Sequence, residues 1–162
     1  MSIAHLGVAD EATQTRRGSE RTPPHDLLAE QSALGGMLLS KDAVADVIET
    51  VRGVDFYLPK HEIIYDAVLA LYSHGEPTDV ITVTDQLSKD GLLSRAGGAE
   101  YLHTLTSLVP TAANAGFYAT IVAEKAVLRR LVEAGTRIVQ MGYGSEERSS
   151  TSSTTRRPRS TT

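Results

Sequence analysis

Apolar residues recur at intervals of three and four along most of the chain, and this spacing predicts helices. The longest periodic stretch runs from Ala115 to Gly142. At about 3.6 residues per turn, its large apolar side chains gather into an arc about 140° wide. These residues are Phe117, Ile121, Leu128, Leu131, Val132, Ile138 and Val139. Such a helix is roughly 40 Å long, which exceeds the diameter expected of the small domain before it. We therefore expect part of its apolar face to lie on something beyond its own domain, although one long helix packed across a single core would show the same pattern.

Five shorter helices are predicted before the long one, at about 25–39, 40–51, 60–74, 78–89 and 99–108. Ser40 is a typical N-cap residue, and Gly75 with Pro77 ends the third helix. The segment 78–89 also contains β-branched residues that suit a strand, but no second strand-like run exists to pair with it. The expected fold class is therefore all-α: a compact bundle of about five short helices followed by one long amphipathic helix.

Two glycines, Gly35 and Gly36, lie in the middle of the first predicted helix. Each costs about 1 kcal/mol relative to alanine in a helix interior. This cost suggests that another helix crosses closely there. A phosphate-binding loop is less favoured, because no strand precedes the pair.

The two ends of the chain differ in character from the middle. Residues 1–22 show no sustained period, and we interpret them as a mobile arm. Residues 145–162 contain no aliphatic or aromatic side chain, so this Ser/Thr/Arg tract is predicted to be disordered. The folded domain is therefore expected at 23–144.

Composition limits the classes of function. The chain has 162 residues, enough for one domain with a proper core, and 41% of them are hydrophobic. We find no membrane-length apolar run and no signal-peptide pattern, and the 0 cysteines suit a cytosolic protein. Residues 23–144 hold 9 Lys and Arg against 15 Asp and Glu, a net charge of −6. An acidic domain matches phosphate backbones poorly, so direct DNA binding by this domain alone is disfavoured.

A search for catalytic motifs is largely negative. No glycine is followed by lysine, so the P-loop signature is absent from this sequence. His61 and Glu62 begin like a metalloprotease box, but Tyr65 occupies the position of the second histidine. The five histidines are scattered, and we interpret each as a surface or capping residue. No catalytic, cofactor or metal site is therefore predicted.

Charged residues on the long helix allow two interpretations each. Glu124 interrupts the apolar arc; it either reaches solvent or a neighbouring cation, or pairs across a helix–helix interface and fixes the register. Arg129, Glu133 and Arg137 follow each other at i, i+4 spacing, which is typical of a solvated face with weak ion pairs. Arg129 and Arg130 could instead contact nucleic acid.

Three ordered stretches together resemble the N-terminal domain of bacterial replicative DNA helicases of the DnaB type. They are PPHDLLAEQSALGGMLLS at 23–40, DFYLPKHEIIYDAVLALYSHGEPTDVITVTDQLSKDG at 55–91, and GGAEYLHTLTSLVPTAANAGFYATIVAEKAVLRRLV at 97–132. No single motif is diagnostic, but the series is specific in combination and covers about residues 23–144.

The resemblance implies a non-catalytic assembly domain of a cytoplasmic protein that works at the replication fork of the bacterial nucleoid. In that family a small helical domain precedes a RecA-like motor, which uses ATP and magnesium and moves 5′-to-3′ along single-stranded DNA. The last helix of the family's domain is the first arm of a helical hairpin, and hairpins from neighbouring subunits pair into dimers. Three such dimers build the N-terminal tier of a hexameric ring, and primase docks on that tier. The family continues past Gly144 into a second hairpin helix, whereas here the Ser/Thr/Arg tract follows. Either the tract is a foreign or altered terminus, which we favour, or it is native and the hairpin is truncated.

The resemblance places candidate subunit contacts on the long helix. They are Phe117, Tyr118, Ile121, Glu124, Leu128, Leu131, Ile138 and Met141, and packing into the core is the alternative for each. The expected partners are further copies of the chain and primase, with single-stranded DNA bound through the motor and no membrane. Rival interpretations are the helicase-binding domain of a primase and a small helical DNA-binding regulator. An unrelated small enzyme is disfavoured, because no acid–base or metal set is assembled.

Overall fold

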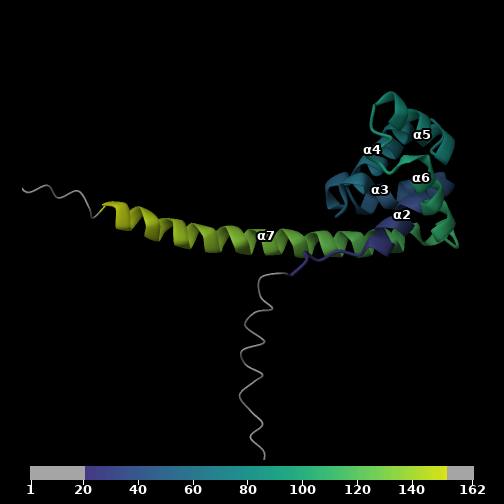
Figure 1. Ribbon diagram of the computed structural model, residues 1–162. Helices are drawn as coiled ribbons and strands as arrows, with labels where there is room; N and C mark the ends of the chain where they lie inside the picture. The colour runs from purple at the N-terminus through teal and green to yellow at the C-terminus, as the bar shows by residue number, and fades with distance from the viewer. Residues whose placement is uncertain (1–20, 153–162) are drawn as a thin grey trace, which may run out of the picture.

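The computed structural model describes residues 21–152, and all regular structure in that range is helical (Figure 1). The elements are α2 (Leu27–Leu39), α3 (Lys41–Thr50), η2 (Gly53–Asp55), α4 (Pro59–Ser73), α5 (Val80–Lys89), α6 (Gly98–Leu108), η3 (Ala112–Asn114) and α7 (Ala115–Ser152). The first seven elements, residues 27–114, form a compact unit that we call the head (Figure 1). The expected all-α class, with one long helix after five short ones, is confirmed.

Local sequence signals explain where the short helices begin. The Ser40 side chain accepts a hydrogen bond from the Ala43 amide at the start of α3. At α5 the Asp79 carboxylate accepts from the Thr82 amide, and this hydrogen bond holds the pKa of Asp79 below its usual value. The ambiguous segment is thus a helix, because its cap satisfies backbone donors that a lone strand would leave unpaired.

Helix α2 is the centre of the head. It contacts α3, α4, α6 and α7, so nearly every residue from Ala29 to Leu38 is buried. Its apolar residues therefore surround the helix and do not form one stripe, as expected for a helix enclosed by neighbours. Leu34 and Met37 are fully buried there, among the core residues contributed by every helix.

The glycine pair lets two other segments approach α2. A Cβ placed on Gly35 would lie 2.3 Å from the carbonyl oxygen of Leu105, at the end of α6. One placed on Gly36 would lie 2.7 Å from the Cβ of Ala115, where α7 begins. Both separations are too short for real side chains, so the expected close crossing is confirmed.

Replacing Gly35 by alanine is expected to lower the free energy of unfolding by about 1–3 kcal/mol, because the new methyl group meets backbone. This loss outweighs the gain of up to about 1 kcal/mol in helix propensity. Gly116→Ala is the matched control, because its Cβ would meet only the Asp46 Cβ, at an ordinary 3.5 Å. The control should keep or raise stability in urea unfolding followed by circular dichroism. Equal effects at the two glycines would contradict the crossing as the reason for Gly35.

Helix α7 runs on to Ser152, so the predicted end at Gly142 and the predicted disorder over 145–152 are wrong. A helix that is already nucleated gains one backbone hydrogen bond per added residue and needs no burial to continue. Glu146, Glu147 and Arg148 are also good helix formers. At about 1.5 Å per residue, the helix is roughly 57 Å long. The rest of the predicted tail, and the predicted arm up to residue 20, lie outside the described residues.

Candidate subunit interface

Helix α7 docks on the head through a stripe of small side chains. Ala115, Ala119, Val122 and Ala126 are buried, and they recur at intervals of four, three and four. This spacing puts them on one side of the helix, where they pack against α2 and α3. Small residues allow the helix axes to come close, which fits the position of Ala115 beside Gly36.

The large apolar residues of α7 lie on the side opposite to that stripe. The exposed fraction is 75% for Phe117, 68% for Leu131 and 69% for Ile138. Other large hydrophobic side chains exposed on this helix are Val127, Leu128, Val132, Val139, Met141 and Tyr143. Figure 1 shows that more than half of α7 projects beyond the head. Apart from Ile121, the arc found from the sequence is therefore not used by this domain's own core.

The seven predicted contact residues other than Glu124 divide into two groups. Five of them are exposed: Phe117, Leu128, Leu131, Ile138 and Met141. Two others, Tyr118 and Ile121, are partly buried at the edge of the core. With Leu28, Leu108 and Pro110, these two line a shallow hollow of about 250 Å³.

Glu124, the remaining predicted contact, is exposed in the middle of the apolar arc. Among the ion pairs and side-chain hydrogen bonds of residues 21–152, none involves its carboxylate. The register-fixing interpretation would therefore need a cation from another chain.

Two arginines hold α7 where it leaves the head. The Arg130 guanidinium lies 2.8 Å from the Asp55 carboxylate. Arg129 donates to the carbonyl oxygen of Pro24 at 2.8 Å and also to that of Asp55. These contacts replace the solvated i, i+4 series expected for Arg129. They also occupy the two groups that the sequence offered for nucleic acid.

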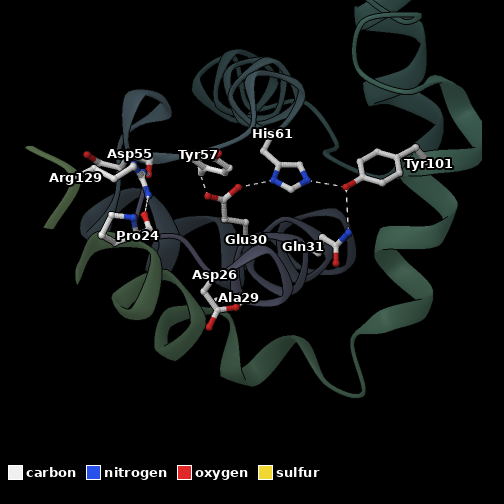
Figure 2. A network of polar contacts seen from close by, with 10 residues as sticks. All are labelled: Pro24, Asp26, Ala29, Glu30, Gln31, Asp55, Tyr57, His61, Tyr101 and Arg129. Atoms are coloured by element: carbon white, nitrogen blue, oxygen red, sulfur yellow. Dashed lines mark hydrogen bonds and ion pairs between the residues drawn. The ribbon is translucent and has the colours of Figure 1, made fainter. Parts of the chain in front are cut away.

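A buried polar network crosses the head beside this point (Figure 2). The Nδ1 of His61 lies 2.5 Å from the Glu30 carboxylate, and Nε2 lies 2.6 Å from the Tyr101 hydroxyl. Glu30 also accepts a hydrogen bond from the Tyr57 amide at 2.5 Å, and Gln31 donates to the Tyr101 hydroxyl at 3.3 Å. Glu30 and His61 are 1% and 0% exposed, so both side chains need the hydrogen-bond partners that this network supplies.

The prediction that His61 is a surface or capping residue is therefore wrong. A usable signal was present, because His61 precedes the buried Ile64 and Val68 by three and seven residues, on one face of α4. In the same way, Glu30 precedes Leu34 and Met37 by four and seven residues on α2. A polar residue in such a stripe indicates a buried partner.

Burial also affects a tyrosine next to this network. Tyr65 donates its hydroxyl proton to the Val51 carbonyl at 2.7 Å. Burial, with smaller contributions from Asp66 and Asp55, raises the pKa of Tyr65 above its usual value of 10.0. The hydroxyl thus stays a neutral donor that ties α4 to the end of α3.

Two other kinds of site are not found in the part of the chain that the structure describes. Residues 21–152 hold no group of three or more His, Asp or Glu side chains placed to bind a metal ion. Within the same range, no helix is both long and apolar enough to cross a membrane. Among these residues, the exposed apolar face of α7 is the feature that indicates a binding partner.

The chain thus folds as an all-α domain in which a small helical head carries a long projecting helix with an unpartnered apolar face. Residues 22–124 match the model of the DnaB-like helicase N-terminal domain, and the chain belongs to that family. The match favours the helicase over the primase domain and the DNA-binding regulator considered from the sequence.

Several relatives carry the same resemblance. The chain is 82% identical over 147 residues to replicative DNA helicase DnaB of Leifsonia xyli subsp. xyli, and covers 32% of its length. It is 62% identical over 145 residues to replicative DNA helicase DnaB of Mycobacterium leprae, and covers 24% of its length. These alignments take in 90% of this chain in both cases. The chain thus spans a third or less of these relatives.

Solved structures agree with the fold. The N-terminal domain of DnaB helicase from Mycobacterium tuberculosis aligns with a TM-score of 0.74 at 69% identity, covering 75% of this chain and 88% of that one. The N-terminal domain of DnaB helicase from Helicobacter pylori, described with its interactions with primase, gives a TM-score of 0.62 at 20% identity. It covers 72% of this chain and 90% of its own, and at this identity it shows the fold alone.

Proposed function

We propose that this chain is the assembly domain of a replicative DNA helicase, and that the exposed face of α7 is its contact with other subunits. The observation that carries the proposal is the row of large apolar side chains from Phe117 to Val139, exposed on a helix whose opposite side docks on the head. Contiguous apolar surface of this kind usually marks an interaction site.

The proposed partner is the same face of a second copy. A helix with one apolar side buries that side most efficiently against another helix with matching periodicity. Fully burying a Leu or Ile side chain contributes about 1.5–3 kcal/mol, so a few such residues in each copy are enough for a stable pair. Glu124 lies within the arc, and we place it opposite a basic side chain of the other copy, where it would fix the register.

The chemistry of the whole protein belongs to a separate domain in this proposal. The P-loop signature is absent from this sequence, so ATP and magnesium would bind to a motor domain, which would also move along single-stranded DNA. The domain described here would hold six such motors in one ring. This work would take place in the cytoplasm, at the replication fork.

Primase is the second proposed partner. Support comes from the Helicobacter pylori domain, which shares the fold and is described with its interactions with primase. In that arrangement, the assembled heads and helices would hold primase close to the strand released by the motor. Unwinding would then be coupled to primer synthesis.

Calorimetry tests both partners. Diluting a concentrated solution of the chain into buffer is expected to release or absorb the heat of subunit dissociation. Titrating the chain with the C-terminal domain of primase from the same organism is expected to give saturable heat. A self-associating chain that gives no heat with primase would remove the primase proposal and leave the assembly proposal standing. Ideal dilution without heat, together with a strict monomer by sedimentation, would overturn the assembly proposal.

A further inference from the structure

We propose that Arg129 and Arg130 clamp α7 to the head and thereby fix the direction in which its exposed half leaves the domain. This inference rests on the proposed function, because the direction matters only if that half is a subunit contact. It assigns a positioning role to the two arginines, which do not lie on the exposed apolar arc.

The clamp lies where the helix loses contact with the head. Ala126 is the last buried residue among residues 115–149 of α7, with 3% of its surface exposed. Arg129 and Arg130 follow within one turn, and most residues after them are exposed. The small-residue stripe therefore ends about one turn before α7 leaves the head, and Arg129 and Arg130 make the contacts to the head in that turn.

The two guanidinium groups reach two separate segments. Arg129 contacts the backbone carbonyls of Pro24, which precedes α2, and of Asp55, at the end of η2. Arg130 pairs with the Asp55 carboxylate at 2.8 Å. The two side chains therefore converge on Asp55, and Arg129 adds a second point of attachment at Pro24. Attachment at two points of the head resists tilting of α7 more than a single contact would.

The segment that receives the clamp is itself fixed. The Asp55 side chain is only 8% exposed, and its second carboxylate oxygen accepts a hydrogen bond from the Arg52 amide at 2.9 Å. Two residues on, the Tyr57 amide donates to the buried Glu30 of the polar network. Figure 2 shows Arg129, Asp55 and Pro24 beside that network. Asp55, which both arginines contact, is thus held in place by hydrogen bonds within the head and does not lie on a freely moving loop.

The clamp matters because a long part of α7 extends beyond it. From Arg130 to Ser152 the helix extends over roughly 33 Å. A pivot of about 20° at the clamp would move the far end by roughly 11 Å, about the width of a helix. An error of that size would misalign apolar side chains that must meet those of another subunit.

Distances between two spin labels, measured by pulsed electron paramagnetic resonance, test this role. The chain contains 0 cysteines, so labels can be attached at Ser88→Cys on α5 and Gln140→Cys on α7, both of which are exposed. An excess of unlabelled chain removes distances between copies, so the measured distance is the one within a single chain, and the measurement is made at a concentration below that at which sedimentation shows self-association.

The expected result is a narrow distance distribution that becomes at least twice as wide when both arginines are replaced by alanine. Helix content by circular dichroism should stay unchanged, which separates positioning from unfolding. Arg137→Ala removes an arginine two turns further along α7, beyond the clamp, and should leave the width unaltered. If the double variant does not fold, Arg130→Ala alone is used, with a smaller broadening expected. A folded clamp variant with the original width would overturn the proposal, whatever sedimentation shows about self-association.

Discussion

Replacing Glu30 by alanine is expected to lower the free energy of unfolding by about 3–5 kcal/mol. The carboxylate is buried and has two partners: the His61 ring at 2.5 Å and the Tyr57 amide at 2.5 Å. Its removal would leave the Nδ1 of His61 and the Tyr57 amide without this partner, so the cost of taking these groups out of water would no longer be offset by a hydrogen bond. The cavity left by the side chain adds to the loss. Urea unfolding monitored by circular dichroism measures the change.

Two further variants serve as comparisons for Glu30→Ala. Glu30→Gln keeps an oxygen that can accept from the Tyr57 amide, so it should fall between the wild type and Glu30→Ala. Glu49→Ala removes an exposed glutamate from α3 and should change stability by no more than about 0.5 kcal/mol. A Glu30→Ala protein within about 1 kcal/mol of wild type would contradict the assigned role of the network.

Replacing Leu131 and Ile138 together by glutamate is expected to weaken self-association at least 100-fold. Both side chains are more than two-thirds exposed in the single chain, so the substitution disturbs little packing within the fold. In a subunit contact, however, it would remove about 1.5–3 kcal/mol of burial per residue and would bury unpaired charges. Because the two side chains are largely exposed in the single chain, the midpoint of thermal unfolding measured at low protein concentration should stay close to that of the wild type.

The matched control for this pair is Thr136→Glu with Gln140→Glu. Both residues are exposed, and they lie beyond the head on the side of α7 that continues the small-residue stripe. The change in net charge is similar, so simple repulsion between copies would weaken association to a similar degree in the two double variants. A clear difference between them assigns the effect to the apolar face.

The sequence was a reliable guide wherever a local rule decides the structure. Ser40 caps a helix, and Gly35 with Gly36 admits close neighbours. These outcomes depend on backbone chemistry within a few residues or on the absence of a side chain, both of which can be read directly. The resemblance to a family was equally informative, because it rests on the order of many residues.

The side of α7 that docks could not be read in the same way. Its large apolar residues dominate the helical pattern, whereas the docked side is made of Ala115, Ala119, Val122 and Ala126, which contribute little hydrophobicity. Their use follows from the shape of the head, where Gly36 leaves room for a close approach. A pattern of hydrophobicity reports how much a residue gains from burial, and not which neighbour is available to bury it.

The clamp and the polar network were missed for a related reason. Asp55 and Arg130 are 75 residues apart, and Glu30 and His61 are 31 residues apart. Partners so distant in sequence are brought together only by the packing of whole helices. The sequence can mark Glu30 and His61 as polar residues in apolar stripes, but it cannot pair them.

Sedimentation equilibrium tests most directly whether the exposed face of α7 is a subunit contact. The measurement compares the wild type with the Leu131→Glu, Ile138→Glu double variant and the Thr136→Glu, Gln140→Glu control over a range reaching high micromolar concentration. The account predicts a concentration-dependent mass above that of the monomer for the wild type and the control, and a monomer for the Leu131 and Ile138 variant. A wild-type chain that stays strictly monomeric at the highest concentration would contradict it.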